Sequence, residues 1–134
     1  MRKLLIIISI LLLYQLNCST STTFLFALVK TESINPYNII WEAISMVESH
    51  KDCKAYNKKE RATGIVQIRP IRLKDYNQRT GSHYKLVDCY KIEVSKKIFM
   101  YYAQQYKHNE YNKIATDWNK CKTNKYWNKV KKYL

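Results

Sequence analysis

The sequence predicts a small, mainly helical domain with little β structure. Its 134 residues suit one domain with one hydrophobic core. Apolar side chains recur every three or four positions in several segments, which is the period of an α-helix. Residues that favour helix ends, namely Asn, Asp, Pro and Gly, stand where these segments would begin or stop.

The first predicted helix begins at Asn35-Pro36, because asparagine can cap free amides and proline is tolerated in the first turn. One face of this helix is apolar and carries Ile40, Ile44 and Val47. Glu48 lies at the edge of that face, close to the expected helix end.

Further helices are expected after a charged loop at Lys58 to Thr63. One runs from Pro70 to Arg79 and is stopped by Gly81, and His83 to Val87 is expected to be extended or loop. Three more helices follow. Asp88 can cap the first of them, the second ends at Trp118-Asn119, and Thr123 can cap the last. Their apolar stripes are Ile92, Ser95, Phe99, Tyr102 and Tyr106; Tyr111, Ile114, Ala115 and Trp118; and Trp127, Val130 and Leu134.

The N-terminus has the features of a secretory signal over residues 1–18. Met1-Arg2-Lys3 is basic, and the apolar run that follows, Leu4 to Leu13, is too short to span a bilayer comfortably. We therefore expect export to the periplasm or the cell exterior, with lipidation of Cys18 as an alternative that would anchor the chain to the membrane. Residues 19–34 form an N-terminal segment of undecided structure, and 35–134 form the domain.

The chain is strongly basic, with a formal net charge of +14. Removal of the leader with Arg2 and Lys3 leaves 22 basic residues against 10 acidic ones, or about +12. Such a charge suits the anionic cell wall, a lipid surface or nucleic acid. Because there is no tight basic run with interleaved aromatic residues, nucleic acid is not an expected partner.

Cysteine usage leaves Cys53, Cys89 and Cys121 in the mature chain. In an oxidising compartment, one disulfide and one free thiol would follow. A zinc site would have to recruit His50 together with these cysteines, of which one pair alone has ligand-like spacing. We therefore expect neither a metal nor a cofactor, and we expect a monomer.

Two clusters of residues carry a resemblance to a known family. The first is Glu48-Ser49, a spacer ending in Ala62, and then the pattern G-x-x-Q-I-x-P from Gly64 to Pro70. This order resembles the soluble lytic transglycosylase and goose-type lysozyme superfamily, whose members cut the glycan of peptidoglycan. The resemblance implies a lysozyme-like helical domain in which Glu48 is the catalytic acid and Ser49 and Gln67 bind the substrate.

The second cluster is Trp118-Asn119, which matches the aromatic-asparagine pair of transglycosylase motifs. Trp118 and Asn119 would then line the cleft beside the catalytic glutamate, although Trp118 is equally suited to the core. The chain departs from the family where Lys120-Cys121 replaces a small residue and glycine, and where Arg69 replaces the frequent methionine. We hypothesise that a disulfide from Cys121 to Cys53 or Cys89 holds the loop in place of the glycine.

The expected function is that of a lytic transglycosylase that cuts the bond between N-acetylmuramic acid (MurNAc) and N-acetylglucosamine (GlcNAc) in glycan strands. Apolar neighbours would raise the pKa of Glu48 and favour proton donation. A lysozyme-like hydrolase is the enzymatic alternative and would need a second carboxylate or a positioned water. A non-catalytic wall-binding or assembly protein is the alternative from another class, and for an isolated glutamate a solvated helix end would be the simplest interpretation.

Overall fold

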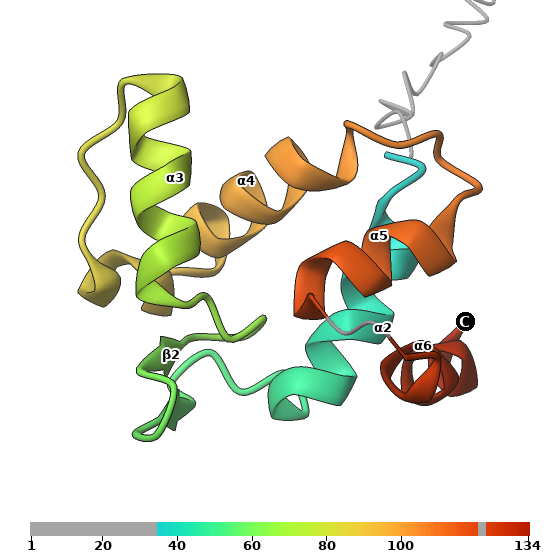
Figure 1. The fold of residues 1–134 in the computed structure, drawn as a ribbon. Coiled ribbons are helices and arrows are strands. Elements are labelled where there is room, and N and C mark those ends of the chain that lie inside the picture. The colour runs from blue at the N-terminus through green and yellow to red at the C-terminus, as the bar shows by residue number, and fades with distance from the viewer. Residues whose placement is uncertain (1–34, 121–122) are drawn as a thin grey trace, which may run out of the picture. The chain divides into compact units, whose positions relative to one another are not determined.

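Helices make up most of the residues that the structure describes, and this confirms the predicted mainly helical class. The computed structural model describes residues 35–120 and 123–134 (Figure 1). Within these residues the α-helices are α2 (Asn38–Ser49), α3 (Pro70–Thr80), α4 (Ile92–Ala103), α5 (Tyr111–Asn119) and α6 (Lys125–Val130). Two 3-10 helices are η1 (Leu86–Tyr90) and η2 (Lys131–Tyr133). The expected signal at 1–18, the segment at 19–34 and Cys121 lie outside the described residues.

A short hairpin follows α2. Its strands β1 (Tyr56–Asn57) and β2 (Ala62–Thr63) pair antiparallel. The prediction of a loop over Lys58 to Thr63 is therefore wrong at Ala62–Thr63. Both residues of β2 are buried, and Thr63 exchanges two backbone hydrogen bonds with Ile68, so tertiary packing holds this segment extended.

Two helix boundaries follow the prediction closely. Helix α3 begins at Pro70 and ends at Thr80, one residue beyond the predicted end, with Gly81 in the left-handed conformation at φ +69°. Helix α5 ends at Asn119 as expected. In α3 the proline and glycine act through the backbone itself, because proline fixes φ and glycine tolerates positive φ.

The predicted caps are wrong in three places. The Asn35 side chain accepts a hydrogen bond from the Tyr37 amide, and α2 itself begins at Asn38 without a side-chain cap. The carboxylate of Asp88 accepts from the amide of Lys85, the residue that precedes η1, and α4 begins later, at Ile92. Helix α6 begins at Lys125 after Asn124 rather than after Thr123. In the first two cases the polar side chain bonds a nearby amide in a local turn instead.

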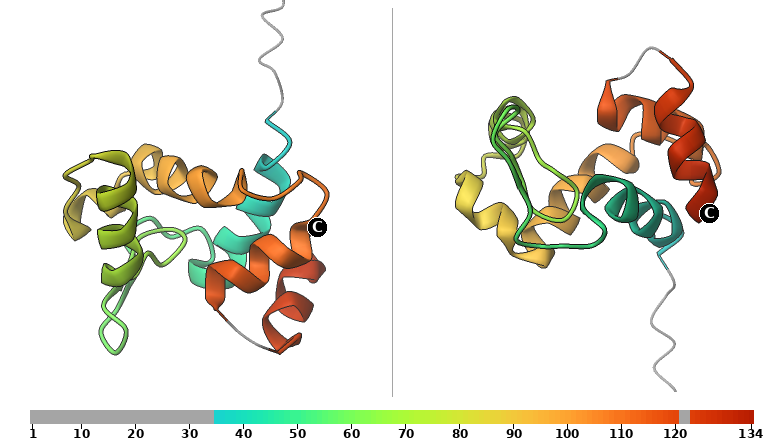
Figure 2. Two further views of the ribbon diagram at one scale, coloured as in Figure 1. Left: turned by 45° about the horizontal axis from the view of Figure 1, so that its top comes forward. Right: turned by 90° about the horizontal axis from the view of Figure 1, so that it is seen from below.

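The elements pack into two groups, and α4 runs from one group to the other (Figure 2). Helices α2, α5 and α6 contact one another, while β2 and α4 both contact η1. Edge-to-face ring pairs pack in the hydrophobic core. The ring centroid of Phe99 lies 5.3 Å from that of Trp41 and 5.0 Å from that of Trp118. The predicted stripe positions Ile92 and Leu134 are instead 45% exposed, because each lies at the end of its helical segment.

Gly64 closes the turn that precedes Gln67. Its φ of +79° favours glycine, and a Cβ at this position would overlap the carbonyl oxygen of Cys89. The hydroxyl of Ser95 donates to that same carbonyl at 2.6 Å, which limits its freedom to move. The turn can therefore approach η1 so closely only because residue 64 lacks a side chain.

We predict that Gly64→Ala lowers the free energy of unfolding by about 3 kcal/mol or more, since it adds overlap to left-handed strain. Gly81→Ala is the matched control: Gly81 also has positive φ but has open space around its Cβ position. It should cost about 1 kcal/mol. Urea unfolding measures both, and equal losses would contradict the close contact at Gly64.

Candidate active site

Glu48 is the next-to-last residue of α2, and its side chain is half-buried. Its Oε1 atom accepts a hydrogen bond of 2.6 Å from the Tyr126 hydroxyl and a longer one of 3.5 Å from Asn119 Nδ2. The helix ends directly after it, because His50 takes the left-handed conformation at φ 55°. The carboxylate is therefore held between α2, α5 and α6.

Burial raises the pKa of Glu48 above its ordinary value. The hydrogen bonds from Tyr126 and Asn119 and the positive charge of Arg69 act in the opposite direction, because they stabilise the ionised form. Burial is the largest of these influences, so the carboxyl holds its proton to a higher pH than an exposed glutamate does.

The turn from Gly64 to Ile68 forms one side of the site. The backbone of Gln67 is left-handed, with φ 52°. Its side-chain nitrogen Nε2 donates to the backbone carbonyl oxygens of Gly64 at 2.9 Å and Ala55 at 3.2 Å. These bonds fix the side chain, which still lines the pocket. The Ser49 hydroxyl donates to the Ile65 carbonyl at 2.7 Å and so ties the end of α2 to this turn.

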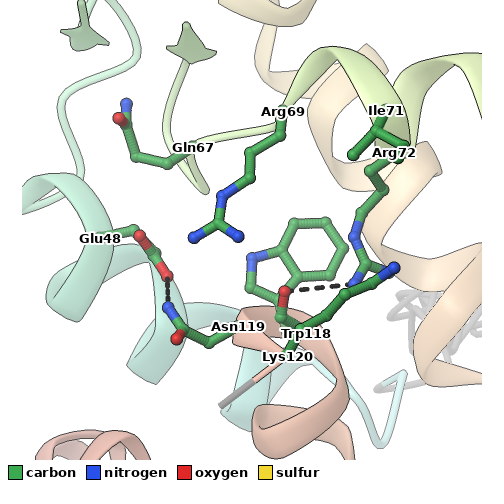
Figure 3. A pocket seen from close by; sticks show the side chains of 8 residues that line it. All are labelled: Glu48, Gln67, Arg69, Ile71, Arg72, Trp118, Asn119 and Lys120. Atoms are coloured by element: carbon green, nitrogen blue, oxygen red, sulfur yellow. Dashed lines mark hydrogen bonds between the residues drawn. The ribbon is translucent and has the colours of Figure 1, made fainter. Parts of the chain in front are cut away.

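Trp118 serves both the core and the site. It is 7% exposed and packs on Phe99, yet one part of it forms the pocket wall. Its indole nitrogen donates to the Val66 carbonyl at 3.0 Å, which joins α5 to the turn. The next residue, Asn119, is the last of α5 and faces Glu48 (Figure 3).

Arg72 fixes the end of α5 from the other side. Its guanidinium donates to the carbonyls of Asp117 at 2.8 Å and Trp118 at 3.2 Å in the last turn of α5, and the Asp117 carbonyl also accepts from the Lys120 amide at 3.2 Å. The same group lies 4.5 Å from the ring centroid of Tyr102 and 4.6 Å from that of Trp118. An arginine thus holds the corner that carries Asn119.

These residues meet at one pocket, whose lining Figure 3 shows in full: Glu48, Gln67, Arg69, Ile71, Arg72, Trp118, Asn119 and Lys120. Four of the five side chains predicted for the site lie there. The fifth, Ser49, is bonded to the turn behind the pocket instead. Sequence reasoning missed Arg72 and Tyr126 altogether. Tyr126 has helical spacing to Val130, but Trp127 fits the same apolar stripe, so the spacing alone does not single out Tyr126.

The pocket lining contains one carboxylate, that of Glu48. Glu60 accepts a hydrogen bond of 2.9 Å from Arg69, and Asp52 accepts one from the Lys54 amide, beyond the end of α2. Asp75 is bonded to Tyr102 and Arg79. Asp75 and Asp117 line a second pocket, which shares Ile71, Arg72 and Lys120 with the pocket that contains Glu48.

Lys120 occupies the position where the resembling family has a small residue. It closes α5 with φ 53°, a left-handed conformation that costs a residue with a Cβ about 1 kcal/mol or more. Cys53 and Cys89 are free thiols and are not bonded to each other. The hypothesised disulfide involves Cys121, which is outside the described residues, so it stays a prediction.

No family model, curated protein or solved structure matches this chain. Among residues 35–120 and 123–134, no helix is long and apolar enough to cross a membrane. The same residues include no group of three or more His, Cys, Asp and Glu side chains arranged to hold a metal ion.

We predict that Tyr126→Phe raises the pKa of Glu48 further, because the lost hydrogen bond favours the ionised form. A pH titration of the glutamate carboxyl signals by NMR measures this shift. Tyr133→Phe is the matched control, because Tyr133 is exposed at 48% in the adjacent η2. An unchanged or lowered Glu48 pKa in Tyr126→Phe would contradict the role of this bond.

Lys120→Gly should raise the free energy of unfolding by about 1 kcal/mol, since glycine adopts positive φ without strain. Lys74→Gly, at an exposed position inside α3, should lower it by about the same amount. Denaturant unfolding of both variants measures the contrast. A Lys120→Gly variant less stable than the wild type would show that the lysine side chain contributes more than its backbone costs.

Proposed function

We propose that this protein is an exported lytic transglycosylase that cleaves the glycan strands of peptidoglycan. The observation that carries the proposal is the environment of Glu48: a half-buried carboxyl that faces a pocket beside Asn119 and the Gln67 turn. Burial favours its protonated form, as a general acid near neutral pH requires. The resemblance at both motif clusters supports the same assignment.

In the proposed reaction, Glu48 donates its proton to the oxygen that bridges MurNAc and GlcNAc. The bond from that oxygen to C1 of MurNAc breaks, and GlcNAc leaves with a new hydroxyl. The 6-hydroxyl oxygen of the same MurNAc then forms a bond to C1, and its proton passes to the Glu48 carboxylate. The product is a 1,6-anhydro end, no water is consumed, and the carboxyl regains its proton.

The hydrogen bonds to Glu48 suit both halves of this reaction. After proton donation the carboxylate is ionised, and Tyr126 and Asn119 stabilise that form. Burial raises the pKa of the Tyr126 hydroxyl well above its usual range, so Tyr126 remains a donor throughout. It therefore orients Glu48 and does not compete as an acid.

A transglycosylase is favoured over a hydrolase because the pocket lining offers one carboxylate. A hydrolase of the two-carboxylate type needs a second acidic group to activate water or to act as nucleophile. The negative charge of Glu60 raises the pKa of Glu48, but the Glu60 carboxylate accepts a hydrogen bond from Arg69. Internal attack by the 6-hydroxyl needs no such partner.

We predict that Glu48→Gln reduces cleavage of purified peptidoglycan by at least about 100-fold, the usual contribution of a general acid. Folding should be kept, since the amide oxygen can still accept the bond from Tyr126. Glu42→Gln is the matched control on the same helix: Glu42 is exposed and pairs with Lys51. It should cleave like the wild type.

Mass spectrometry of the released fragments identifies the reaction. Anhydro ends are expected, whereas reducing MurNAc ends would identify a hydrolase. Equal cleavage by Glu48→Gln and the wild type would remove Glu48 from the mechanism. If the wild type binds the wall and releases no fragments, the non-catalytic alternative replaces the enzyme.

A further inference from the structure

Arg69 offers unused donors to the pocket. It precedes α3, and its guanidinium extends toward the space between Glu48 and Trp118 (Figure 3). Its Nε atom donates to Glu60 Oε2 at 2.9 Å. Its two terminal nitrogens make no hydrogen bond to any residue within 35–120 or 123–134. An arginine carries five donor hydrogens, so most of its bonding capacity remains available.

The other two cations of the pocket lining, Arg72 and Lys120, are less suited than Arg69 to bind a planar ligand. Arg72 is 9% exposed and is bound to carbonyls, to Asp117 and to two rings. Lys120 is exposed and forms no ion pair with a described residue, but an ammonium lacks a planar fork. Arg69 is therefore the lining cation best suited to a planar, two-oxygen ligand.

The pair with Glu60 orients this fork. Both side chains are partly exposed, at 36% and 44%, so as an ion pair alone they add little stability. The single bond through Nε nevertheless holds one edge of the guanidinium against the hairpin and leaves the terminal nitrogens free. Terminal guanidinium nitrogens bind carboxylates through two parallel hydrogen bonds, which are stronger than neutral ones.

We propose that Arg69 binds a carboxylate of an acidic sugar, so that the site prefers glycan strands whose MurNAc carboxylates are free of peptide. This inference rests on the proposed function. A peptide stem converts that carboxylate into an amide and removes the charge that Arg69 recognises. The preferred substrate is thus peptide-free glycan, and intact peptidoglycan is a poorer one.

Binding of an anion at Arg69 also acts on Glu48. The positive charge of Arg69 lowers the pKa of Glu48, against the effect of burial. A substrate carboxylate beside the guanidinium offsets this charge and favours the protonated acid. An acidic glycan therefore helps to prepare the proton donor that cleaves it.

The test uses the full chain and two substrates: peptide-free glycan strands with free carboxylates, and the same strands after amidation of those carboxylates. Wild-type kcat/KM should be at least about tenfold higher on the free-carboxylate strands, the gain from one charge-assisted contact. Arg69→Met should bring this ratio close to one, mainly through KM. Arg69→Lys should retain part of it, since it keeps the charge without the fork.

Two controls separate recognition from general attraction. Arg79→Met removes a cation from α3 outside this pocket, where Arg79 pairs with Asp75, and should keep the wild-type ratio. Glu60→Gln should also keep a preference, because the terminal nitrogens remain. A preference that survives in Arg69→Met, or that falls equally in Arg79→Met, overturns the proposal.

Calorimetric binding of both strand types distinguishes failure of this inference from failure of the proposed function. Cleavage without charge preference overturns the role of Arg69 and leaves the enzyme intact. Charge-selective binding that Arg69→Met abolishes, without cleavage by the wild type, supports Arg69 and overturns the transglycosylase. Absence of both binding and cleavage overturns both.

Discussion

The geometry of the site depends on how the turn from Gly64 to Ile68 is held. The Ser49 hydroxyl reaches it from α2, and the Trp118 indole reaches it from α5. Each bonds a turn carbonyl that would lose its partner if the helix moved, and a buried unpaired carbonyl costs about 1–3 kcal/mol. The turn therefore couples the C-terminal ends of α2 and α5. These ends bring together Glu48 and Asn119, which are 71 residues apart in sequence.

This coupling requires α5 to end in a fixed direction, and the side chain of Arg72 and the backbone of Lys120 both contribute to that. Arg72 places positive charge at the negative pole of the helix and binds its last carbonyls. Lys120 accepts a left-handed backbone to turn the chain away. A glycine would make the same turn with less strain.

Much of the fold was predictable because its signals act through the local backbone. Proline and glycine fix the ends of α3, and apolar periodicity located α5. The caps at Asn35 and Asp88 failed because the same polar side chain can bond a turn amide or a helix amide, and the choice depends on packing. Four of the five predicted site residues line one pocket and Ser49 does not. Tyr126 was missed because both it and Trp127 fit a stripe that includes Val130.

The pKa of Glu48 is subject to opposing influences. Burial favours the neutral form, and its place at the negative end of α2 acts in the same direction. The hydrogen bonds from Tyr126 and Asn119 favour the anion. Because both influences act on one carboxyl, each offsets part of the other. The proposed reaction would use this balance, since in it Glu48 acts first as an acid and then as a base.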